Sequence, residues 1–320
     1  MTSKQLRART LRTQNLKTAT EWLQNDLPMS TRLRESLERL LGELLESDSV
    51  KGVVIEELGA QGEVRQLAAL GLSVFLEDKS FDAYLSARRP FLLIDILEKA
   101  LAGKESGILD RRQIAKANSG DGLNLLVLYM QRGWDLSDPH WRAVATLGHE
   151  AYVIHHRGYH LKRALQEDWA SNTAMYTTNG GYRALGTVSV KGVALPIVPP
   201  EDERVFLYAD REEVLRRAPG STVAYVFEHR RPRFGFAASE QRVLIRALEG
   251  STDIEIADQL GLSLTTVKHA WKRIYERASS VAPFVIGEDI EDGRRGQEKR
   301  RKLLVYLEDH PEELRPYANK

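Results

Sequence analysis

Residues 236–278 carry the most regular pattern in the chain and read FAASEQRVLIRALEGSTDIEIADQLGLSLTTVKHAWKRIYERA. Apolar residues recur in this stretch at three- and four-residue steps, which predicts helices with one buried face. Gly250 ends the first helix, Thr252 caps the second, and Gly261 supplies the turn before the third. The stretch therefore predicts a compact all-α unit of three helices.

The third of these helices has a basic outer face. Between residues 263 and 278 it carries four Lys or Arg residues and one acidic residue, and Lys268, His269 and Lys272 lie off its apolar stripe. Two short helices joined by a glycine turn, the second of them basic, are typical of a helix-turn-helix that enters the major groove of DNA. The alternative is an ordinary solvated helix in a three-helix bundle, because residues 233–282 have a net charge of only +1.

Residues 236–278 also resemble the DNA-binding domain of the LuxR (GerE-like) family of bacterial transcription regulators. The matching motif positions are Glu240, Val243-Leu244, Gly250, Glu255-Ile256-Ala257, Leu260, Ser263, Thr266-Val267-Lys268 and Ile274. The resemblance implies that Thr266 and Lys268 hold DNA phosphates and that His269 and Lys272 face bases. Thr265 and Arg273 complete the implied DNA-binding set.

The chain departs from the pattern of that family in two places. Ala270 stands where the family usually has histidine, and residues 279–283 read SSVAP where the family has a short dimerisation helix. Dimerisation through that helix is therefore not expected. A homodimer is still expected, because one such head contacts few base pairs, and the helices at 30–45 and 138–166 are the candidate interfaces.

The first 230 residues predict an α+β region of different character. Its expected elements are a weakly patterned helix at 4–24, an amphipathic helix at 30–45, a hairpin of strands at 53–58 and 64–70, a buried strand at 123–131 and a helix from Asp138 to about Gln166. This order resembles a GAF-type sensor domain, an antiparallel sheet with flanking helices. The resemblance implies a small-molecule or protein effector, which the sequence does not identify.

The predicted fold class is thus a GAF-like α+β sensor region followed by an all-α helix-turn-helix domain. In chain order we expect an N-terminal helix (1–29), the sensor domain (30–166), a small β-rich extension (167–229), a linker (230–235), the LuxR-type domain (236–282) and a tail helix (283–320). The tail helix either contacts DNA, supplies a dimer surface, or packs on the helical bundle.

The composition excludes several classes of protein. The 320 residues contain 46 basic and 45 acidic side chains and no cysteine, which excludes a polycation, a disulfide scaffold and a thiolate metal site. The longest apolar stretch, at 123–130, is shorter than the ~20 residues that span a bilayer. With no secretory pattern among the first residues, we expect a cytoplasmic protein without membrane contact.

Three histidines give the best candidate for a metal site. His149, His156 and His160 fall on one side of the expected helix, and such spacing can chelate a metal ion. The alternative is a polar flank beside the apolar face of that helix, and in the absence of a further ligand cluster we expect no metal.

We find no familiar enzyme motif and therefore expect no catalytic residues, no cofactor and no enzyme. The function predicted from the sequence is a bacterial DNA-binding transcription regulator, whose N-terminal region controls a LuxR-like head that binds double-stranded DNA. Two alternatives remain: a protein-interaction module that uses the helix-turn-helix as a protein-binding surface, or an unrecognised enzyme with a DNA-binding appendage.

Overall fold

A computed structural model describes residues 5–130, 136–196, 201–217, 219–286 and 295–318 of the chain. The strands in this part are β1 (Gln5–Thr10), β2 (Val50–Leu58), β3 (Val64–Leu76), β4 (Leu123–Met130), β5 (Leu161–Trp169), β6 (Arg183–Ser189) and β7 (Glu203–Asp210). The α-helices are α1 (Thr13–Asp26), α2 (Thr31–Glu46), α3 (Asp78–Ala87), α4 (Leu92–Leu101), α5 (Arg111–Ser119), α6 (Pro139–His156), α7 (Arg211–Arg216), α8 (Thr222–Val226), α9 (Ala238–Leu248), α10 (Asp253–Leu260), α11 (Leu264–Val281), α12 (Pro283–Ile286) and α13 (Arg295–Asp309). Short 3-10 or π-helical turns are η1 (Ala170–Asn172), η2 (Met175–Gly180) and η3 (Pro311–Leu314).

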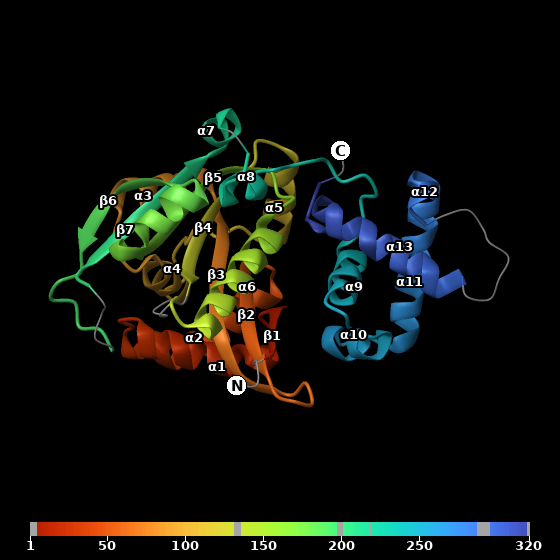
Figure 1. Cartoon of the computed structure of the whole chain (residues 1–320), viewed down its shortest axis with the longest axis horizontal. Coiled ribbons are helices and arrows are strands. Elements are labelled where there is room, and N and C mark those ends of the chain that lie inside the picture. Colours follow the sequence, from red (N-terminus) through yellow and green to blue (C-terminus); the bar gives the residue numbers. More distant parts are fainter. Residues whose placement is uncertain (1–4, 131–135, 197–200, 218, 287–294, 319–320) are drawn as a thin grey trace.

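All of these strands belong to one mixed sheet with the order β1-β2-β3-β4-β5-β7-β6. Neighbouring strands are antiparallel except β4 and β5, which are parallel. The parallel pair requires a crossover connection, and α6 provides it by crossing one face of the sheet between the two strands (Figure 1).

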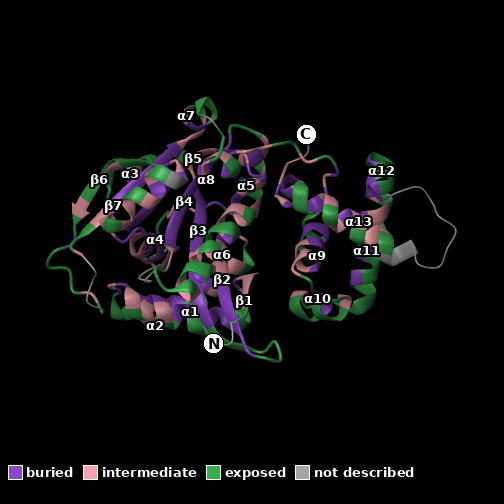
Figure 2. Ribbon diagram, in the orientation of Figure 1, coloured by how far each residue is buried: buried purple, intermediate pink, exposed green. Residues whose placement is uncertain are grey.

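Helices cover both faces of the sheet. Helices α1 to α4 form one apolar core with the sheet, and α5, α7 and α8 contribute to a second core, while α6 packs over β2 and β3. Burial follows these layers: the inner strands are purple in Figure 2, and the outer sides of the helices are green. The parallel pair therefore lies at the centre of the molecule, buried on both sides.

Several expected elements are confirmed. The apolar run LNLLVLYM forms β4, with seven of its eight residues buried. The amphipathic helix at 30–45 is α2, and the Ser30 hydroxyl caps it by accepting a hydrogen bond from the Leu33 amide. The predicted hairpin is β2–β3, in which β2 begins earlier and β3 ends later than expected. Strong local signals were sufficient for these elements.

Two expected elements are wrong. Residues 5–10 form the edge strand β1 rather than the start of a helix, because β2 offers its free edge to them. Helix α6 ends at His156 rather than near Gln166, and residues 161–169 form β5. The helical spacing of apolar residues continues past residue 156 in the sequence. In the structure, residues 161–169 instead lie between two neighbouring strands of the sheet and are buried from both sides.

The C-terminal helices α9 to α13 share an apolar core of their own and are tied to the sheet region by charged contacts. Glu249, at the end of α9, accepts hydrogen bonds from the side chains of Thr10 and Arg12. Asp48 lies 2.7 Å from Arg111 and 3.4 Å from Arg242. We call these residues the junction.

The predicted fold class is therefore wrong in both parts. The N-terminal region is not an antiparallel GAF-like sheet, because a parallel pair lies at its centre and strands from residue 5 to residue 210 share the sheet. The helices that follow have an apolar core of their own, but they are held against that region at the junction and are not the distinct helix-turn-helix domain that was expected. Capping and periodicity predict helices, but not the neighbour against which they pack.

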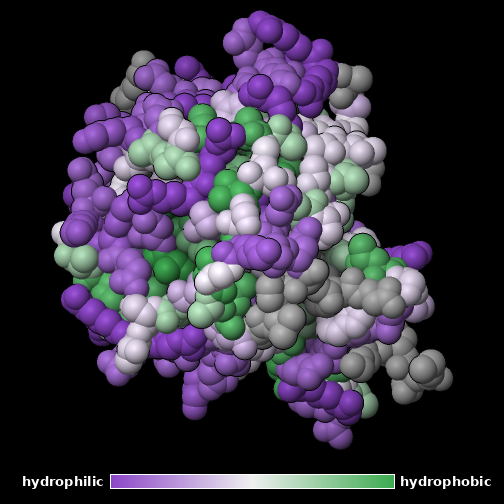
Figure 3. All heavy atoms as spheres, turned by 90° about the vertical axis from the view of Figure 1, so that its left-hand side faces the viewer, coloured by the Kyte–Doolittle hydropathy of each residue, from purple (hydrophilic) through white to green (hydrophobic). Residues whose placement is uncertain are grey.

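None of the helices in the described part of the chain is long and apolar enough to pass through a bilayer. On the face shown in Figure 3, apolar residues form several separate patches among hydrophilic residues.

Candidate active site

The sheet opens between β4 and β5. Their parallel register ends at Val127 and Gln166, although β4 continues to Met130 and β5 continues to Trp169. On its other side β5 is paired with β7 from Arg163 to Trp169. Two strand ends therefore lie next to each other without being paired to each other, in the middle of a sheet.

A β-bulge lies at the same place. Val127 is opposite Ser73 and Tyr129 is opposite Leu72, so that Leu128 is an extra residue on β4. A bulge bends its strand and re-aims the groups around it. Here it coincides with the end of the β4–β5 pairing and helps to open the sheet.

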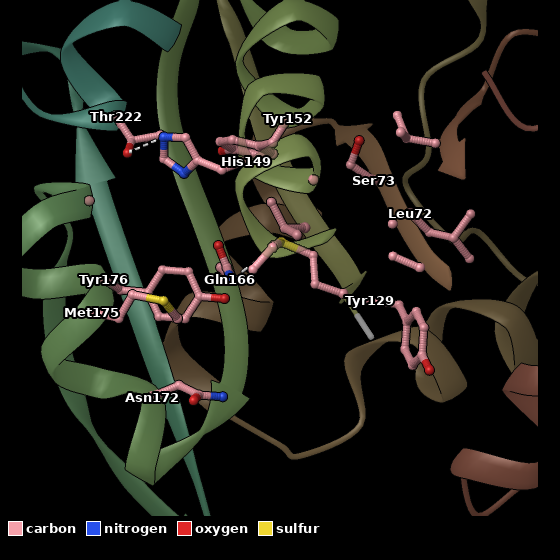
Figure 4. Close-up of a pocket in the computed structure, with 18 of the residues that line it drawn as sticks. Leu72, Ser73, Tyr129, His149, Tyr152, Gln166, Asn172, Met175, Tyr176 and Thr222 are labelled. Carbon is pink, nitrogen blue, oxygen red and sulfur yellow. Dashed lines mark hydrogen bonds between the residues drawn. The ribbon is translucent and has the colours of Figure 1, made fainter. Parts of the chain in front are cut away.

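A cavity of about 350 Å³ occupies this opening and the space beneath α6. Its lining comes from β2 to β5, from α6, from the turns η1 and η2, and from the start of α8. Figure 4 shows His149, Gln166 and Tyr176 around one space, from α6, β5 and η2 respectively. The size is typical of a small-molecule site.

The lining is apolar and rich in aromatic side chains. It includes Tyr129, Tyr152, Trp169, Tyr176 and Tyr182. Tyr129 belongs to the core on the α1–α4 side of the sheet, and Tyr176 and Tyr182 belong to the core on the other side. The cavity thus reaches residues of both layers, because the sheet is open between them.

A buried serine–histidine pair lies on one wall. The Ser73 hydroxyl is 2.7 Å from Nε2 of His156, and Nδ1 of His156 is 2.8 Å from the carbonyl oxygen of Tyr152. Burial lowers the pKa of His156 to about 3, so the ring is neutral at ordinary pH. Since a carbonyl oxygen only accepts, Nδ1 carries the proton and Nε2 accepts a hydrogen bond from Ser73.

Two further polar pairs face the cavity. The hydroxyls of Tyr152 and Tyr182 are 2.6 Å apart, and burial raises the pKa of Tyr182 to about 12 and that of Tyr152 well above its ordinary value. Nε2 of His149 lies 3.2 Å from the Thr222 hydroxyl, so α8 orients this imidazole. Both pairs are hydrogen-bonded, and both tyrosines are neutral.

The turn after β5 positions a tyrosine and its carboxylate partner. Tyr176 donates a hydrogen bond to Oδ2 of Asp168 at 2.5 Å. The other carboxylate oxygen of Asp168 accepts from the Asn172 side chain at 2.9 Å and from the Trp169 amide at 2.7 Å. Asp168 is buried behind the cavity wall, whereas Tyr176 and Asn172 line the cavity.

Leu136, in the turn that leads into the start of α6, lines the cavity. This helix end is already capped, because Asp138 accepts a hydrogen bond from the His140 amide and Pro139 has no N–H to donate. Among the described residues, this helix end therefore has a negative side chain in the place where an anion would bind.

The structure separates the histidines that the sequence placed in one stripe. His149 contacts Thr222 and His156 contacts Ser73, while His160 lies beyond the end of α6 and stacks on His229. Among the described residues no group of three or more potential ligands is arranged to hold a metal ion. The separation follows from the end of α6 at residue 156.

The residues assigned to DNA lie far along the chain from this cavity, on α11. Thr265, Thr266, Lys268, His269, Lys272 and Arg273 are all exposed. Lys272 makes a distant ion pair of 3.9 Å with Glu276. Their exposure does not identify a partner, and their role stays a prediction.

Sequence reasoning missed Ser73, Tyr152, Asp168 and Tyr176. No local motif marks them, since they come from β3, α6, β5 and η2. The available signal was the polar and aromatic stretch at the end of β5 and directly after it, from Trp169 to Tyr182.

No family model matches the chain, and no curated protein matches it. Among solved structures it is similar to a variant of the spermidine N-acetyltransferase SpeG from Vibrio cholerae, with 12% identity over 66% of this chain and 96% of that chain and a TM-score of 0.37. It is also similar to a putative arylalkylamine N-acetyltransferase 7 from the yellow fever mosquito, with 10% identity, coverage of 64% and 87%, and a TM-score of 0.36.

These findings correct three expectations. The similar structures are acetyltransferases and not LuxR-type regulators, so the identification of residues 236–278 with the LuxR family is wrong. The transcription-regulator function, and the DNA-binding classification that accompanied it, are overturned by the same finding. The expectation that the chain is not an enzyme is likewise contradicted.

Proposed function

We propose that this chain is an acyl-transfer enzyme whose active site is the cavity between α6 and the sheet. The observation that carries the proposal is the opening between β4 and β5, where the register ends at Val127 and Gln166 and an apolar cavity takes the place of further pairing. Of the functions considered from the sequence, this one is nearest to the unrecognised enzyme.

An extended ligand with amide groups suits such an opening. Strand backbone that is not paired with another strand can bind an extended chain through main-chain hydrogen bonds, as in β-augmentation. The pantetheine arm of acyl thioester carriers is extended, carries amides along its length and ends in the thiol that bears the acyl group. Placed between β4 and β5, its thioester would reach the bulge at Leu128.

The groups around the cavity can serve the chemistry of transfer. The nitrogen of an amine acceptor attacks the thioester carbonyl carbon, a C–N bond forms and the C–S bond breaks. The nitrogen gives up a proton, which His149 accepts, and the leaving thiolate takes a proton from the Tyr176 hydroxyl, which turns from Asp168 to the sulfur. In this placement, backbone amides at the bulge would lie near the carbonyl oxygen on which negative charge develops.

In this proposal the protein binds the donor through its pantetheine arm. The start of α6 offers a capping carboxylate rather than an anion site (Asp138), so the described residues there do not favour the phosphates of a nucleotide. Acetyl-pantetheine, which lacks the nucleotide, is therefore expected to replace acetyl-coenzyme A with a loss of kcat/KM of no more than about tenfold. We place the enzyme in the cytoplasm, where such thioesters are made and used.

The test is acetyl transfer by the full chain, with acetyl-coenzyme A or acetyl-pantetheine as donor and a panel of aromatic and aliphatic amines as acceptors. Tyr176→Phe keeps the ring but removes the proton donor, and kcat should fall by about a hundredfold or more. Tyr225→Phe is the matched control, because Tyr225 is an exposed tyrosine on α8 and its substitution should leave kcat unchanged.

Two results would contradict the proposal. The absence of transfer from either donor to every amine of the panel would remove acyl transfer as the function. Equal loss of activity in Tyr176→Phe and Tyr225→Phe would show that the phenol of Tyr176 has no special role.

A further inference from the structure

The charges around the cavity are one-sided. Among the described residues that line it there is a lysine, Lys51, and no aspartate or glutamate. Lys51 lies on β2 near His156, and its positive charge disfavours protonation of the His156 imidazole. A cation that entered this space would meet the positive charge of Lys51 and no carboxylate among the described lining residues.

Two carboxylates lie close behind the cavity wall, but both accept hydrogen bonds from other groups of the protein. Asp168 accepts hydrogen bonds from Tyr176, Asn172 and the Trp169 amide. Glu167 accepts from the amides of residues 91 and 92 and from Arg204 at 2.7 Å. Each is buried, so neither presents a free oxygen to a ligand in the cavity.

The remaining polar groups are dipoles rather than charges. His156 and Ser73 are paired with each other, Tyr152 is paired with Tyr182, and Gln166 is 2% exposed, with its amide 3.9 Å from the sulfur of Met130. Moving a cation from water into such a space is strongly unfavourable unless an opposite charge meets it.

We infer that the acceptor of this enzyme is an uncharged, aromatic or otherwise apolar amine, and that the cavity excludes polyamines. The role of the amine as acyl acceptor rests on the proposed function, but the selectivity for uncharged ligands is a property of the cavity itself. Aromatic walls bind a flat apolar ring, and an arylamine stays neutral at neutral pH and keeps its nucleophilic lone pair. A polyamine is multiply charged under the same conditions.

Binding by the full chain is measured by isothermal titration calorimetry, without any donor, for para-butylaniline and for spermidine. The expected result is saturable binding of para-butylaniline and at least about a hundredfold weaker binding of spermidine. Equal or tighter binding of spermidine would overturn the inference.

Two substitutions connect the selectivity to the cavity. Gln166→Glu places a carboxylate in the wall and should raise the affinity for spermidine relative to para-butylaniline by about tenfold. Lys51→Gln removes the lining cation from a half-buried position and should move the ratio in the same direction by about threefold, which keeps the test available if Gln166→Glu does not fold.

Gln259→Glu is the matched control for the carboxylate, since Gln259 is exposed on α10 and its substitution should leave the ratio unchanged. An unchanged ratio in both Gln166→Glu and Lys51→Gln would overturn the inference, because the selectivity would then arise outside this cavity.

The binding test and the transfer assay test the ligand class and the proposed function independently. Binding of para-butylaniline without any acetyl transfer would remove the proposed function and leave the ligand class intact. Acetyl transfer that is faster to spermidine than to para-butylaniline would leave the function intact and remove the ligand class.

Discussion

The junction and the cavity both bury polar side chains, but they do so in opposite ways. At the junction the groups are charged and paired: Glu249 is 14% exposed and lies against Arg12, which is 13% exposed. In the cavity wall the groups are neutral and hydrogen-bonded, as in the pair of Ser73 and His156. Buried charge holds two parts of the chain together, whereas neutral polar groups leave a space in which an uncharged ligand can bind.

The largest expected effect comes from breaking the junction. Glu249→Ala removes the carboxylate that meets Arg12 and Arg246 and leaves buried guanidinium groups unpaired. The free energy of unfolding should fall by about 3 kcal/mol, measured by urea denaturation. Glu43→Ala is the control, because Glu43 pairs with Arg39 on the surface, and it should cost less than about 1 kcal/mol. Equal losses would show that the junction is not special.

Acidification should weaken the cavity wall at a higher pH than the junction. His156 has an ordinary pKa of 6.5 that burial lowers to about 3 in the folded chain, so the unfolded chain binds the extra proton first. This contribution to stability is present above 6.5 and is lost as pH falls from 6.5 toward about 3.

The same change affects the junction only at lower pH. Burial raises the pKa of Glu249, but Arg246, Thr10 and Arg12 lower it by more, to below its ordinary value of 4.5. Its stabilisation is therefore fully present above 4.5 and is lost as pH falls through the folded pKa.

His156→Gln tests the cavity half of this difference. Between neutral pH and about pH 5, the wild-type chain should lose roughly 2 kcal/mol more stability than the variant, measured by denaturation at each pH. Parallel loss in the two chains over this range would show that His156 is not buried as a neutral group.

A smaller effect is expected from Ser73→Ala. The substitution removes the hydroxyl that donates to His156 and should lower the free energy of unfolding by about 1 kcal/mol. Ser280→Ala is the control, since that hydroxyl is exposed on α11 and donates to the backbone carbonyl of Arg277 in its own helix. If Ser73→Ala were neutral in denaturation, the pair would not stabilise the cavity wall.

The smallest effect is expected on α11. Lys268→Ala removes an exposed side chain that belongs to neither the junction nor the cavity, and stability should change by less than about 0.5 kcal/mol. A loss comparable to that of Glu249→Ala would place α11 in the junction, contrary to the contacts described above.

Local signals predicted more of the helical part than of the sheet. Thr252 caps α10 as expected, in a capping box with Glu255, and Ser263 caps α11 by accepting a hydrogen bond from the Thr266 amide. Those signals lie within one turn of helix, so the sequence displays them directly. The same signals led to the family assignment that the comparisons overturn, because they describe helix ends and a basic face and not a function.

The candidate site was not predictable in this way. Ser73 and His156 are 83 positions apart in the chain, and their contact depends on α6 ending where it does and crossing β3. The opening between β4 and β5 depends on the register and on the bulge at Leu128. Neither register nor bulge leaves a clear mark in the apolar run of β4.

The sequence by itself determined most of the helices and the buried strand β4, because capping residues, glycines and the period of apolar residues act over a few neighbouring positions. Only the tertiary structure decided that β4 and β5 run parallel and then separate, and which polar groups meet in the space between them. That outcome depends on pairing between distant segments, whose energies arise from packing and burial and not from any one stretch of residues.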